Sequence, residues 1–470
     1  MKLSRILVPL MFSMSLSQTA CMKTAPTASQ QNTPEVFSTQ AQEEEEDCQV
    51  AQSGSRQFLP KTQMPPFGRI LPAHENDCGF YNWAWQTFLF STKADSQNRP
   101  DFIHYPALEQ VFQIAAGDTG PTDLPLLNGG VKQAGDHAAV LVDQNRNPVV
   151  YSIHTNAVFA EFVRSHDLYN WQKMLKTPEQ GGISSELEFP PGSVEYKAAW
   201  RILEPGEIAP DYFTMRARIP VLKNKGKSVD TTAQTREVTV ALLSLHVVGV
   251  VEDHPEFIWA TFEHADSDGR LDLVPTALEN PVAGQIQKLA SPHPAYPLFG
   301  HGATAVEGNQ LPPVQNIDES TQKFTAPTPI FRVYPASFSD SAEADAGLES
   351  LNENMGKLFA QTDPQAQDLR RHYRLVGAVW LDNPESKNPQ GVFKANRNFE
   401  NKPGETILAG EDNLASMAME SFAQTPAMNC LSCHNTTPKY IQGQQVFPAR
   451  KINVSNVMSY MAQQDLKPAH

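Results

Sequence analysis

The chain has 470 residues, with 37 Lys and Arg against 52 Asp and Glu, and a formal net charge of −15 at pH 7. This length leaves room for two or three domains or one large core, and it excludes a small disulfide-stapled fold. A chain this acidic lacks the positive field that binds phosphate backbones, so we expect no nucleic-acid partner. The 37 prolines and 26 glycines indicate many turns and extended connections rather than a helical bundle.

The N-terminus has the pattern of a bacterial export signal. Two basic residues are followed by an uncharged apolar stretch, residues 6–16, which is too short to span a bilayer. Gln-Thr-Ala-Cys at 18–21 resembles a lipoprotein cleavage box with Gln where Leu is usual, and the alternative is ordinary cleavage that leaves a free thiol. We expect a signal peptide over 1–20 and lipidation of Cys21. This predicts a periplasmic protein that contacts the outer membrane only through its N-terminal lipid anchor.

A polar segment follows the export signal. Residues 21–47 are rich in Thr, Gln, Pro and Ala and end in an acidic run over 43–47. This composition buries too little apolar surface to fold. We therefore expect a disordered acidic tether, and we assign it no binding role.

Cys48 and Cys78 form the next candidate pair, because an oxidising compartment favours disulfides. A bond between them would close a loop of about 30 residues and stabilise the fold by about 3–4 kcal/mol in the loop-entropy model. The alternative is a second metal site, but no His or Cys spacing near these residues supports it. We expect a Cys48–Cys78 disulfide.

Residues 48–404 predict a β-rich body with peripheral helices, which places the protein in the α+β class. The dense aromatic segment 80–90 predicts a buried helix, residues 138–153 predict a hairpin, and residues 157–169 predict a second helix. Alternating and continuous apolar runs then predict the strands of an antiparallel meander, over 194–202, 212–218, 237–251, 256–264, 330–334 and 373–381.

A histidine and a glutamate stand out in two apolar strands of this body. If residues 252–255 form a tight turn, His246 lies opposite Thr261. His246 and Glu263 then become diagonal neighbours on one face, while His264 points the other way. Such a pair could be a catalytic acid–base couple, a ligand set for a second metal or a relay, and the alternative is a satisfied buried polar pair.

A motif near the C-terminus predicts a haem. Cys-Leu-Ser-Cys-His at 430–434 has the C-x-x-C-H spacing of covalent c-type haem attachment, and the chain carries an export signal. Two thiols at this spacing add to the two vinyl groups of one haem, and the following His becomes the proximal iron ligand. The alternative is a thioredoxin-like redox motif, but such motifs lie near the start of a βαβ unit. We expect one covalent haem c held by Cys430, Cys433 and His434. A relay formed by His246 and Glu263 would lie beside this haem, and we expect these two residues to line the place where the body meets it.

Apolar stripes flank this motif on both sides. Residues 414–422 predict an amphipathic helix, and residues 454–461 predict a second one. Helix, C-x-x-C-H, loop and helix is the outline of a small helical cytochrome c-like segment, which we assign to residues 405–470. Met458 and Met461 are candidate distal ligands; the alternatives are core packing for both, five-coordinate iron or a distal His from the body.

The chain resembles a group of bacterial exported single-haem proteins that are called cytochrome c family proteins. The resemblance covers residues 80–465 in patches and implies a β-rich body fused to a C-terminal haem c segment. It also implies shared site or structural positions at Glu263-His264 and at Glu195-x-Lys197. Besides the haem motif, the resemblance rests on the segments 80–88, 194–200, 259–264 and 414–424.

Two functional classes are compatible with these motifs. The first is electron transfer or haem-dependent redox chemistry, with a redox partner protein or a small-molecule substrate. The second is an envelope binding or sensor protein in which the haem is a structural or gas-sensing group. The two classes differ at the sixth coordination position of the iron, which an electron carrier keeps filled and a peroxidase, oxygenase or gas sensor keeps open.

Overall fold

The described residues of the computed structural model all lie within Glu45–His470. The expected signal peptide, the lipidation site Cys21, the tether and Cys48 lie outside the described residues, as do the distal-ligand candidates Met458 and Met461. The structure describes residues 78–113, 124–135, 139–176, 178–266, 269–274, 296–298, 308–333, 342–381, 395–396, 406–410, 414–424, 430–441 and 444–457.

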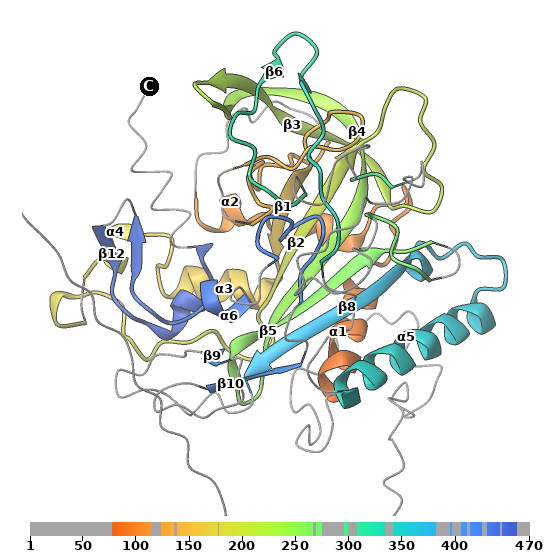
Figure 1. Ribbon diagram of the computed structural model, residues 1–470. Coiled ribbons are helices and arrows are strands. Elements are labelled where there is room, and N and C mark those ends of the chain that lie inside the picture. Colours follow the sequence, from red (N-terminus) through yellow and green to blue (C-terminus); the bar gives the residue numbers. More distant parts are fainter. Residues whose placement is uncertain are drawn as a thin grey trace, which may run out of the picture. The chain divides into compact units, whose positions relative to one another are not determined.

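One large sheet organises the described part of the chain (Figure 1). It has eight strands in the order β1-β2-β4-β5-β8-β10-β9, with β3 paired to β4 outside this order. All pairs are antiparallel except β9 with β10. The α+β class with an antiparallel β-rich body is therefore confirmed. The strands are β1 Val150–Thr155, β2 Val194–Ile202, β3 Thr214–Lys225, β4 Ser228–Val251, β5 His254–His264, β8 Tyr373–Leu381, β9 Ala395–Asn396 and β10 Thr406–Gly410.

Helices and two small hairpins lie around the sheet. The hairpins pair β6 Ile317–Asp318 with β7 Lys323–Phe324, and β11 Lys439–Ile441 with β12 Gln444–Phe447. None of the helices among the described residues is long and apolar enough to cross a membrane. The α-helices are α1 Cys78–Ser91, α2 Leu108–Val111, α3 Ala157–Ser165, α4 Trp171–Met174, α5 Ala342–Thr362 and α6 Cys430–Cys433, and the 3-10 helices are η1 Asp101–His104, η2 Pro178–Gln180, η4 Leu369–His372 and η5 Lys451–Val454.

Most of the predicted elements are present. The aromatic helix is α1, and the strands predicted over 194–202 and 373–381 have those bounds in the structure. The strand predicted over 330–334 is absent from the described residues 330–333, so this prediction is wrong. The reason is that side chains bind its backbone: Phe331 N–H donates to Asn309, and the Phe331 carbonyl accepts from Gln424.

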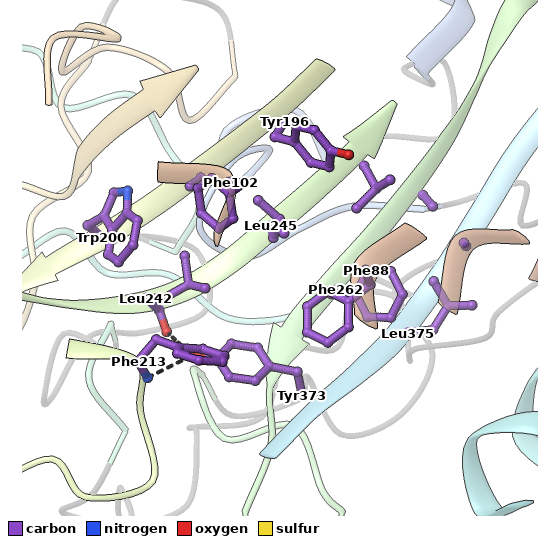
Figure 2. Close-up of a cluster of buried hydrophobic side chains, with 14 of the residues drawn as sticks. Phe88, Phe102, Tyr196, Trp200, Phe213, Leu242, Leu245, Phe262, Tyr373 and Leu375 are labelled. Carbon is purple, nitrogen blue, oxygen red and sulfur yellow. Dashed lines mark hydrogen bonds between the residues drawn. The ribbon is translucent and has the colours of Figure 1, made fainter. Parts of the chain in front are cut away.

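The two faces of the sheet differ in chemistry because side chains alternate along each strand. One face is apolar: Leu245 lies opposite Phe262 on β5 and opposite Ala198 on β2. Helix α1 packs here, and the rings of Phe88 and Phe262 stack with centroids 4.1 Å apart. Figure 2 shows Phe88 and Phe262 side by side within this core. The apolar face therefore anchors α1 and leaves the other face for different contacts.

Candidate functional site

The second face of the sheet carries polar side chains on its three central strands. Lys197, His246 and Thr261 are in register across β2, β4 and β5. Two further rows flank this one, and the three rows together define the polar face. The first flanking row is Glu195, Val248 and Trp259, and the second is Ala199, Ser244 and Glu263.

Residues 414–424 cover one end of the polar face, and they form turns instead of the predicted helix. Their backbone groups are bound by groups outside a helical repeat. The Met417 N–H donates to the carboxylate of Glu263 (2.6 Å), and the Phe422 N–H donates to the Ala134 carbonyl (3.0 Å). The hydroxyl of Tyr151 donates to the Ala418 carbonyl (2.7 Å). These bonds replace the helical pattern, so the apolar spacing of this segment reflects packing on the sheet.

His246 connects the centre of the polar face to this covering segment. Its Nε2 lies 2.8 Å from Oε1 of Glu420, and its Nδ1 lies 2.9 Å from the Thr261 hydroxyl. A carboxylate only accepts, so Nε2–H donates to Glu420. Burial alone would raise the pKa of Glu420, but His246, Lys197 and the backbone N–H of Ser416 together lower it. Glu420 is thus held as a carboxylate.

Glu263 is an anchoring residue at the end of the face. It is fully buried, and its carboxylate pairs with Arg332 while also accepting from Met417 N–H. The predicted His246–Thr261 register is confirmed. His246 and Glu263 therefore share a face as expected, but in the described hydrogen bonds each contacts a different partner, Glu420 and Arg332 respectively. The geometry brings both onto the surface that the C-terminal segment covers.

The C-x-x-C-H motif forms one helical turn. Helix α6 spans both cysteines, and the His434 N–H donates to the Cys430 carbonyl over 2.8 Å. The two cysteines differ in exposure: Cys430 is half-buried and Cys433 is exposed. The turn packs through Leu431 into an apolar cluster with Trp259. Two cysteine side chains therefore lie on the same helical turn, next to the histidine that follows them.

His434 is held in one orientation by the residues around it. Its Nδ1 lies 3.0 Å from the carbonyl oxygen of Val454 in η5. A carbonyl only accepts, so Nδ1 carries the proton and the lone pair is on Nε2. The ring lies against the indole of Trp259, with centroids 4.0 Å apart. Burial, with the nearby charge of Lys439, lowers the pKa of His434 to about 3, so the imidazole is neutral.

A neutral imidazole with Nδ1–H bonded to a carbonyl and a free Nε2 is the form that ligates a metal. Within the described residues, Nε2 of His434 makes no hydrogen bond, and the buried indole Nε1 of Trp259 beside it has no partner either. Among the described residues there is no group of three or more His, Cys, Asp or Glu side chains that could hold a metal ion by themselves. In a haem-loaded chain, His434 would ligate the iron, and Cys430 and Cys433 would form the thioether bonds.

Glu195 and Lys197 link the polar face to this motif. Burial lowers the pKa of Lys197, opposed by Glu420, Glu195 and Cys430. Its ammonium group donates to the Gln133 carbonyl over 3.0 Å. Burial raises the pKa of Glu195 to about 7, although the Ser455 hydroxyl, 3.2 Å away, and Lys197 both lower it. The two residues are the Glu-x-Lys positions that the resemblance implies.

Cys78 begins α1 and is disulfide-bonded in the structure. Cys48 lies outside the described residues, so its pairing with Cys78 stays a prediction. In comparisons with known proteins, no family model, no curated protein and no solved structure matches this chain.

The sequence did not point to every residue of this site. Glu420 lies in a segment whose apolar spacing predicted a helix, and no local pattern indicates that it bonds His246. Trp259 lies in a predicted strand and in a segment that carries the resemblance, but no sequence pattern places its ring against His434. Val454 contributes a backbone carbonyl, which any residue type could supply.

Proposed function

We propose that the chain carries one covalent haem c, attached through Cys430 and Cys433 with His434 as proximal ligand, and acts in electron transfer or haem-dependent redox chemistry. The observation that supports this best is the orientation of His434. Its Nδ1–H donates to the Val454 carbonyl, which leaves the Nε2 lone pair for a ligand, and the two cysteines precede it on one helical turn. A structural histidine of this kind would be expected to use both nitrogens.

Haem at this place supplies a one-electron redox centre. The chain's own residues hold and shield it. Val454 fixes the tautomer of His434, and Trp259 packs against its ring and excludes water from one side. The charged side chains of the polar face, beneath the motif, can respond to a change of charge at the redox centre. A redox partner protein or a small-molecule substrate would exchange the electrons.

The proposal also includes a compartment and a haem-carrying segment. Haem c attachment and a Cys48–Cys78 disulfide both suit an exported protein, so we propose a periplasmic location with lipidation at Cys21 as the membrane anchor. We further propose that residues 405–470 are the haem segment. In its described part, β10 extends the large sheet, and α6 and η5 are short helices on either side of the β11–β12 hairpin.

Covalent attachment is tested by expressing the full chain with a c-type haem maturation system and denaturing it. We expect haem to stay with the polypeptide in a stained gel and in the intact mass. Replacing both Cys430 and Cys433 with Ser should abolish it, while His434→Ala should alter the spectrum and impair attachment. His104→Ala is the matched control, because its side chain is 44% exposed and remote from the motif in sequence. Haem that is extracted completely by acidic acetone would contradict the proposal.

The sixth ligand is tested on the same protein. We expect one of Met458→Leu and Met461→Leu to convert a low-spin spectrum into a high-spin one if that methionine is the distal ligand. Carbon monoxide binding to the reduced wild-type protein would instead indicate an open position, which favours enzymatic or sensing chemistry over simple electron transfer.

A further inference from the structure

Glu195 lies one peptide unit away from the hydrogen bond that orients His434. Its Oε2 is 3.2 Å from the Ser455 hydroxyl. Ser455 follows Val454, whose carbonyl accepts from Nδ1 of His434 over 3.0 Å. Glu195 also shares a cross-strand row with Trp259, on which the His434 ring packs. Glu195 therefore lies close to the C-x-x-C-H motif by two routes, one through the backbone of η5 and one across the sheet through Trp259.

The other charged groups around this place are already compensated. On β4, His246 bonds with Glu420 of the covering segment, and Glu420 also accepts from the backbone of Ser416. On β2, Lys197 donates to the Gln133 carbonyl and lies 5.7 Å from the Tyr151 ring.

Glu195 itself has weaker compensation from the described residues. The hydroxyl of Ser455 is its hydrogen-bond partner, and Lys197 is the nearby positive charge. Lys439 of β11, Lys197 and Glu420 act on His434, and of these only Lys197 acts on Glu195. Burial raises the pKa of Glu195 to about 7, so a small change of the local potential changes its protonation at neutral pH.

We infer that Glu195 is the proton-accepting group of the redox centre, so that it takes up one proton when one electron enters the haem site. This inference rests on the proposed haem attachment. The electron comes from an external one-electron donor, the proton comes from water, and the Glu195 carboxylate becomes a carboxylic acid. No bond within the chain breaks. The physical reason is that an added negative charge in a poorly solvated site is offset most readily by protonating a nearby carboxylate whose charge is weakly compensated.

The experiment measures the midpoint potential of the haem-loaded full chain against pH, from about pH 5 to pH 9. Because reduction raises the affinity of Glu195 for a proton, the wild-type potential should fall as pH rises through neutrality, with a slope approaching about 59 mV per pH unit. Glu195→Gln should abolish this slope. In infrared difference spectra between the two redox states, the wild type should gain a protonated-carboxyl band on reduction, and Glu195→Gln should lack it.

Two further variants keep the test decisive. Ser455→Ala removes a hydroxyl that lowers the pKa of Glu195, so the sloping region should move to higher pH, and this variant replaces Glu195→Gln if the latter does not fold. Glu161→Gln, on the exposed side of α3, is the matched control and should keep the wild-type profile. The inference alone is overturned if the wild-type midpoint potential does not change with pH. It is also overturned if Glu195→Gln keeps the wild-type slope, or if the sloping region does not move in Ser455→Ala. A chain without covalent haem overturns the proposed function and this inference together.

Discussion

The imidazole of His434 lies on the indole of Trp259, with ring centroids 4.0 Å apart and an angle of 41° between the planes. This contact joins β5 of the large sheet to the C-x-x-C-H turn, and Trp259 also packs with Leu431 and Val454 in one apolar cluster. The indole thus supports the ring of the histidine that we propose as the haem ligand.

We expect Trp259→Ala to lower the free energy of unfolding by about 3–5 kcal/mol, because it opens a cavity beneath the C-terminal segment. Trp259→Phe keeps a ring against His434 and should retain most of that stability. Urea denaturation measures both variants. A loss below about 1 kcal/mol in Trp259→Ala would mean that the stack does not hold the motif.

The buried ion pair of Glu263 and Arg332 should behave as an anchor rather than as a catalytic group. Glu263→Gln leaves Arg332 buried without its counter-charge and should cost about 3–5 kcal/mol of stability. The double variant Glu263→Gln, Arg332→Met removes the stranded charge and should recover part of the loss. Denaturation curves and the haem spectrum of the folded fraction check this. An intact fold with lost redox activity in Glu263→Gln would assign Glu263 a functional role instead.

Glu109 should make the fold less stable at alkaline pH. It is buried at α2, and within the described residues its Oε1 has no hydrogen-bond partner. Burial raises its pKa to about 7. Because the folded-state pKa is raised, its contribution is fully present below the unfolded-state pKa and is lost as pH rises through about 7.

Glu109→Gln removes this titration, so the variant should gain about 1–3 kcal/mol relative to the wild type at about pH 8 and little at about pH 4. Unfolding free energies at both pH values check this. Equal differences between variant and wild type at the two pH values would exclude a raised pKa.

Two glycines should respond in opposite ways to alanine. A Cβ on Gly249 of β4 would lie 2.7 Å from the buried Trp83 ring of α1, whereas one on Gly356 of α5 would meet nothing within 4 Å. Gly249→Ala should therefore destabilise the fold by about 1–3 kcal/mol through overpacking. Gly356→Ala should stabilise it by about 0.5–1 kcal/mol, because alanine loses less backbone entropy in a helix. Thermal unfolding compares them, and a neutral Gly249→Ala would contradict the close packing of α1 on the sheet.

Local patterns in the sequence were sufficient for strands β2 and β8 and for the register between β4 and β5. Alternation over 194–202 produced β2 with the predicted bounds, because one face of that strand meets an apolar core and the other meets polar groups. The turn before Glu256 placed His246 opposite Thr261, because pairing in a hairpin follows directly from the position of the turn.

Only the tertiary structure decided the conformation of residues 414–424 and the partners of the site. Met417 bonds to Glu263 across 154 residues of sequence, and Glu420 bonds to His246 across 174. Apolar periodicity reports which side of a segment is buried, but it carries no information on remote groups that bind its backbone. The predicted helix was replaced by turns for this reason. Buried carboxylates and amides far apart in the chain must be satisfied together, and the fold brings them into hydrogen-bonding distance.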